Sequence, residues 1–118
     1  MLFRSKPVKW YLAASAGSAP DIVARVIADR LVSMWGQQII IDNRPGAGGN
    51  AGTAAGAQAP ADGYNLLFAG NTQFTLVKFT NADLPYDPQR DIAPISLIAY
   101  LPSVLFINSS LPVASWPE

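Results

Sequence analysis

The sequence predicts an α/β fold with a mostly parallel sheet flanked by helices. Short apolar runs at 8–14, 38–42 and 64–69 have the composition of strands. The segments 19–35 and 50–59, which lie between these runs, have helical patterns instead. Strands that alternate with helices in this way imply a parallel sheet with right-handed crossovers.

The first helix has clear signals at both ends. Ser18 and Asp21 have the S-x-x-D form of a capping box, Pro20 falls in the first turn, and Gly36 is a natural stop. Apolar residues recur along the segment at spacings of three and four, which predicts one buried face. That face would consist of Ile22, Val23, Val26, Ile27, Leu31 and Met34.

The second and third strands flank a helix that is rich in alanine. The run 38–42 is β-branched and is expected to be buried on both faces of the sheet. Asn50 is expected to cap the following helix, which should end before Pro60. Small side chains would let this helix pack close against the sheet.

Beyond the third strand the pattern is weaker. We expect a short helix at 74–79, a proline-containing loop at 81–91, and two more strands at 95–101 and 104–108. The last residues, 115–118, have the S-x-x-E form of a helix start, which favours a chain that is a fragment of a longer protein.

Composition excludes several classes of function. The 118 residues suffice for about one domain, with 50% hydrophobic and 14% charged residues and a net charge of zero. The scattered basic residues form no stripe that would bind nucleic acid. The chain lacks histidine and cysteine, which removes disulfides, thiol nucleophiles, histidine bases and zinc sites of the usual ligand sets. We expect no metal site and no cofactor, and no catalytic constellation is visible. It also lacks a membrane-spanning run of about 20 apolar residues and a signal peptide.

Candidate chemistry lies in the loops that follow the strands. In an open parallel sheet, ligands bind beyond the carboxyl ends of the strands. The loops 15–21, 44–50 and 70–74 meet this condition and are rich in small and polar residues. The first two lead into helix N-termini, whose unpaired N–H groups and about half a positive charge favour an anion. A carboxylate is therefore a suitable ligand.

These loops also have other interpretations. The glycines fit a tight turn with close helix–sheet packing, and Arg44 fits an ion pair with Asp42. The spacing of Gly46, Gly48 and Ala51 formally matches a dinucleotide fingerprint, so a nucleotide-binding enzyme domain is an alternative. A third hypothesis is a remnant that binds nothing and self-associates through uncovered sheet edge and apolar surface.

Five ordered motifs resemble the Bug-type receptors of tripartite tricarboxylate transporters. The longest, Gly-Gln-Gln-Ile-Ile-Ile-Asp-Asn-Arg-Pro-Gly-Ala-Gly-Gly-Asn at 36–50, resembles the signature of the second strand almost letter for letter. The other motifs are the opening segment 3–9, the helix motif 21–25, and the segments 59–64 and 84–95.

The resemblance implies a partial type II periplasmic binding-protein fold. Residues 1–100 would be an incomplete first lobe, and 101–118 would cross into a truncated second lobe. The expected function is that of a periplasmic receptor without enzymatic activity. It would capture a small carboxylic acid and deliver it to the membrane permease components of such a transporter.

The resemblance also assigns binding residues by position. They are Ala14, Ser15, Gly17, Ser18 and Asp21 in the first loop, Gly48, Gly49, Asn50 and Thr53 in the second, and Gly70, Asn71 and Thr72 in the third. The family's first loop usually reads Pro-Phe-x-x-Gly-Gly. Here Ala-Ala-Ser-Ala-Gly-Ser stands at 13–18, which removes an aromatic ring and a glycine and alters the shape of the cleft.

Overall fold

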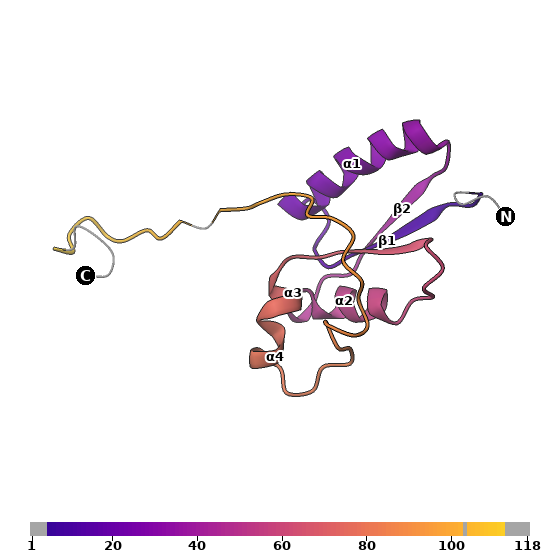
Figure 1. Cartoon of the computed structure of the whole chain (residues 1–118). Coiled ribbons are helices and arrows are strands. Elements are labelled where there is room, and N and C mark those ends of the chain that lie inside the picture. Colours follow the sequence, from indigo (N-terminus) through magenta and orange to yellow (C-terminus); the bar gives the residue numbers. More distant parts are fainter. Residues whose placement is uncertain (1–4, 103, 113–118) are drawn as a thin grey trace.

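The computed structural model describes residues 5–102 and 104–112. Its centre is a three-stranded parallel sheet with the strand order β2-β1-β3. The strands are β1 at Val8–Leu12, β2 at Ile39–Asn43 and β3 at Asn65–Phe68. Figure 1 shows α1 on one side of the sheet and α2 on the other. The predicted α/β fold is therefore confirmed.

The hydrophobic core lies between the sheet and α1, which spans Ala19–Trp35. Every second residue of β1 points into it, because side chains alternate between the two faces of a strand. Val8, Trp10 and Leu12 are buried, and the Trp10 ring stacks on Phe68 with the ring centres 6.1 Å apart. Ala24 and Ala28 of α1 complete the buried cluster, since their small side chains let the helix approach the sheet.

The predicted bounds of α1 are confirmed, but its predicted capping box is wrong. Gly36 ends the helix in the left-handed conformation (φ +68°) and donates its N–H to the carbonyl of Val32. At the other end, Ser18 donates its hydroxyl to the carbonyl of Ser15 at 2.6 Å. Asp21 accepts the N–H of Gly17 at 2.8 Å, because the preceding loop folds back over the first turn.

The buried face of α1 differs from the predicted one. Ile22, Val26 and Met34 are mostly exposed, with accessible fractions of 57%, 66% and 66%. The face against the sheet carries the buried residues Asp21, Ala24 and Ala28, with Ile27, Leu31 and Trp35 packed beside them. The spacing of the apolar residues predicted the helix correctly, but it did not predict which of its faces packs against the sheet.

The second strand is not buried on both faces as predicted. β2 lies at an edge of the sheet, so only one side of it has a neighbouring strand. The helix α2, at Asn50–Ala57, packs mainly against β1 and β3. Ile40 is therefore 50% exposed.

The chain after β3 contains two short helices, α3 at Thr72–Thr75 and α4 at Val77–Thr80, where one helix was predicted. The residues 81–91 form the expected loop.

The two strands predicted at 95–101 and 104–108 are wrong, since the described residues there form no strand. Their side chains are exposed, including Phe106 at 85%, and Figure 1 shows this segment leading away from the body. Isolated apolar extended segments lack the cross-strand partners that stabilise a sheet. The predicted helix start at 115–118 lies outside the described residues.

None of the described helices is long and apolar enough to cross a membrane.

Replacing Gly52 with alanine tests how closely α2 approaches the sheet. An added Cβ would lie 2.7 Å from the Cα of Ala13 and 2.8 Å from the carbonyl oxygen of Arg44, both of which are backbone atoms. We expect Gly52→Ala to lower the free energy of unfolding by about 2 kcal/mol, measured by urea denaturation.

Gly56→Ala, one turn further along α2, is the matched control. There the new Cβ meets the side chain of Leu67 at 3.0–3.4 Å, and alanine's better helix propensity, about 1 kcal/mol, offsets the crowding. Equal effects of the two substitutions would contradict the close approach at Gly52.

Candidate functional site

The loops that follow the three strands start from one point in the sheet. Arg44 donates its N–H to the carbonyl of Leu12 at 2.9 Å, and Ala13 donates its N–H to the carbonyl of Phe68 at 3.1 Å. The carboxyl end of β1 is thus bonded on one side to the chain leaving β2 and on the other to the end of β3. The structure therefore brings the three predicted loops together at one edge of the sheet.

The first loop is held by a network around Asp21, which is only 2% exposed. Its Oδ2 accepts the N–H of Gly17 at 2.8 Å and Nε–H of Arg25 at 3.0 Å, and its Oδ1 accepts Nδ2–H of Asn43 at 2.9 Å. Asn43 also donates to the carbonyl of Ala14 at 3.3 Å. The bonds from Arg25, Gly17 and Asn43 lower the pKa of Asp21 to about 2, so this carboxylate is ionised at neutral pH.

The second and third loops are joined by Gln73, a buried residue of α3. Its Nε2 donates to the carbonyl of Gly48, and its Oε1 accepts the N–H of Gly70 at 3.0 Å. Gly49 leaves room for this contact, since a Cβ there would lie 2.8 Å from Nε2 of Gln73 and 2.9 Å from the carbonyl oxygen of Ala13. The glycine at position 49 is thus required by close packing and by its φ of +96°.

Tyr86, from the long loop 81–91, contacts both Gln73 and the N-terminus of α2. Its hydroxyl donates to the carbonyl of Gln73 at 3.2 Å and lies 3.5 Å from Oδ1 of Asn50. Burial raises the pKa of this phenol, so it keeps its proton and remains a donor.

The predicted site residues fall into two groups by accessibility. Asp21, Gly49 and Thr53 are buried, and the Thr53 hydroxyl donates to the carbonyl of Gly49 at 2.9 Å. These three residues support the loops from inside. The others lie at the surface or half-buried: Ala14, Ser15, Gly17, Ser18, Gly48, Asn50, Gly70, Asn71 and Thr72.

Sequence reasoning placed Gln73 in the loop 70–74 without assigning it to the site, and it did not assign Asn43 or Tyr86 to the site either. Asn43 and Gln73 are polar residues beside strand ends, which was the available signal, but their partners are far away in sequence. Arg44 forms the predicted ion pair with Asp42, at 3.0 Å.

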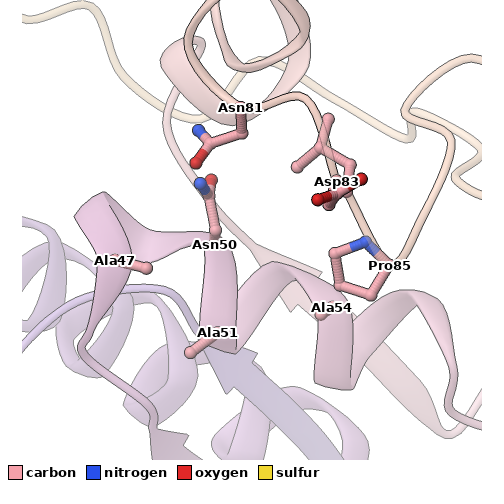
Figure 2. A pocket seen from close by; sticks show the side chains of 8 residues that line it. Ala47, Asn50, Ala51, Ala54, Asn81, Asp83 and Pro85 are labelled. Atoms are coloured by element: carbon pink, nitrogen blue, oxygen red, sulfur yellow. The ribbon is translucent and has the colours of Figure 1, made fainter.

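A shallow hollow of about 240 Å³ lies beside the N-terminus of α2. Figure 2 shows the Asn50 and Asn81 amides close together on one side, with Asp83 and Pro85 along the other. Alanines of α2 and of the preceding turn contribute much of its apolar lining. In the part of the chain that the structure describes, no cluster of acidic side chains could hold a metal ion.

Residues 23–118 match the family model described as tripartite tricarboxylate transporter family receptor. The chain belongs to this family. Within it, a UPF0065 protein of Bordetella bronchiseptica is 37% identical over 114 residues, which are 97% of this chain and 34% of that protein. Protein BugT of Bordetella pertussis is 33% identical over 114 residues, 96% of this chain and 35% of its own length. The chain thus spans about a third of these relatives.

Solved structures of similar proteins agree with the fold. An R. palustris protein whose structure is described as "with adipate" is 31% identical, with a TM-score of 0.71 over 75% of this chain and 29% of that one. The periplasmic binding protein BugD is 36% identical, with a TM-score of 0.51 over 53% of this chain and 21% of its own. The receptor-family sheet described above is therefore consistent with part of one lobe of a periplasmic binding protein.

Replacing Gln73 with glutamate tests the junction between the second and third loops. The introduced carboxylate would face the carbonyl of Gly48, where the amide now donates, so we expect a loss of about 2 kcal/mol of unfolding free energy at neutral pH. Burial and repulsion raise the folded-state pKa of such a carboxylate. The loss should therefore shrink as the pH falls through that pKa, because the protonated group can donate again.

The measurement is urea denaturation at several pH values, with Gln38→Glu at an exposed position as the control. A pH-independent difference between the two variants would argue against the hydrogen bonds assigned to Gln73.

Proposed function

We propose that this chain forms one wall of the solute-binding site of a periplasmic receptor without enzymatic activity. The receptor captures a small carboxylated solute and delivers it to the membrane permease components of a tripartite transporter. The observation that carries the proposal is the joining of three small-residue loops at the carboxyl edge of one parallel sheet. Family membership supports the same function.

The exposed backbone of the loops suits a carboxylate. Among the described residues, the N–H groups of Ser15 and Ala16 have no hydrogen-bond acceptor, and both residues are exposed. Gly48 and Gly70 are exposed and have no side chain, so a ligand can approach the backbone there, although the N–H of Gly70 is already bonded to Gln73. Each charge-assisted bond to a carboxylate contributes about 1.5–3 kcal/mol, and the nearby N-terminus of α2 adds a favourable potential.

The division into lobes is part of the same proposal. Residues 1–100 belong to the first lobe, and 101–118 lead toward a second lobe that would supply the opposite wall. The exposed apolar side chains at 95–107 support this division, because they are suited to burial against further structure. No observation favours the dinucleotide interpretation of Gly46, Gly48 and Ala51 over this one.

Binding of adipate to this chain tests the proposal, since a similar protein has been solved with that dicarboxylate. We expect saturable binding in a calorimetric titration and a rise in the melting temperature that grows with adipate concentration. The matched control is 1,6-hexanediol, which has the same carbon chain with hydroxyl groups in place of carboxylates. Equal responses to both compounds, or none to adipate and to a panel of other small carboxylic acids, would contradict the carboxylate site.

A further inference from the structure

Among the described residues, the buried polar side chains are those of Asp21, Thr53 and Gln73, and of these Asp21 carries a charge. A buried carboxylate is costly unless its oxygens are hydrogen-bonded. Here both oxygens are used, by three donors from three different parts of the chain: Gly17 of the first loop, Arg25 of α1 and Asn43 of β2. The carboxylate therefore joins the loop, the helix and the strand.

We propose that Asp21 is the positioning residue of the first loop and determines which backbone N–H groups of that loop face the solute. This inference rests on the proposed function. Gly17 has a φ of +79°, and its N–H points to Asp21 rather than outward. The Gly17 amide is thus withdrawn from solute binding, whereas Ser15 and Ala16 are exposed residues whose N–H groups have no acceptor among the described residues.

Asn43 links Asp21 to the start of the second loop. Its Nδ2 faces two acceptors, Oδ1 of Asp21 and the carbonyl of Ala14, while its Oδ1 accepts Nη2–H of Arg25 at 3.1 Å. Rotating the amide by half a turn would put oxygen against oxygen at Asp21 and nitrogen against nitrogen at Arg25. The orientation of the Asn43 side chain is therefore fixed by its partners. Because Arg44, the first residue of the second loop, follows Asn43 directly, the start of that loop is held in place as well.

Arg25 contributes to the network from the surface of α1. Its side chain is 52% exposed, so solvent screens its ion pair with Asp21. The bonds of Asp21 to Gly17 at 2.8 Å and to Asn43 at 2.9 Å tie the first loop and the end of β2 to the carboxylate. An ionised carboxylate repels an anionic solute, so the role of Asp21 is to place backbone atoms.

The substitution Asp21→Asn removes this role with little change in size. A carboxamide has one acceptor oxygen, so when that oxygen serves Gly17 and Arg25, its NH2 group faces the NH2 group of Asn43. The double substitution Asp21→Asn with Asn43→Asp reverses donor and acceptor and restores that pair, but it loses the bond from residue 43 to the carbonyl of Ala14. Asp29→Asn, at an exposed position two turns further along α1, is the control.

The first reading is amide hydrogen exchange followed by NMR in the 118-residue chain. We expect the N–H of Gly17 to exchange about tenfold faster in Asp21→Asn, relative to the N–H of Lys9, which is bonded to the carbonyl of Tyr64. The ratio of the exchange rates of the Gly17 and Lys9 amides separates local opening of the first loop from global unfolding. Asp29→Asn should leave it unchanged, and the double substitution should restore it in part. If Asp21→Asn alone does not fold, recovery of a folded chain by the double substitution supports the proposal.

The second reading is the affinity for adipate, which should fall about tenfold in Asp21→Asn and recover in part in the double variant. An unchanged exchange ratio at Gly17 would overturn the proposal, as would an unchanged adipate affinity despite faster exchange. Failure of the double substitution to restore either reading would also overturn it. If the unsubstituted chain does not bind adipate or other carboxylic acids, the proposed function fails, while the exchange ratio still decides whether Asp21 holds the loop.

Discussion

The carboxyl end of β1 is the constraint on which the rest of the structure depends. The carbonyl of Leu12 and the N–H of Ala13 are bonded to the chain leaving β2 and to the end of β3. The backbone of Gly52 in α2 also approaches Ala13 so closely that no Cβ fits. These contacts make three loops, distant in sequence, start within one small area. A solute that touches one loop is therefore near the other two.

Local signals sufficed to predict the elements around this point. The bounds of α1 follow from Pro20 and Gly36, which act on the backbone whatever the tertiary structure is. The alternation of strands and helices predicted the parallel sheet, and the topology then placed the three loops at one edge. The positions of the loops could thus be predicted before any side-chain contact was known.

Features that depend on distant partners could not be predicted. Asp21 binds Asn43, 22 residues away, instead of the backbone of its own helix, and Gln73 binds Gly48, 25 residues away. The exposure of Ile40 depends on the order of the strands, which places β2 at an edge. The segment around Phe106 has the composition of a strand, but no described strand lies beside it to complete a ladder.

An NMR titration of the isotope-labelled chain with adipate tests directly whether the three loops form one binding surface. We predict shifts with a single dissociation constant for the amide resonances of Ser15, Ala16, Gly48, Gly70 and Asn71. The amides near the C-terminal end of α1, on the far side of the sheet from α2, should not respond. Shifts confined to the hollow at Asn81–Pro85, or different dissociation constants for the separate loops, would contradict it.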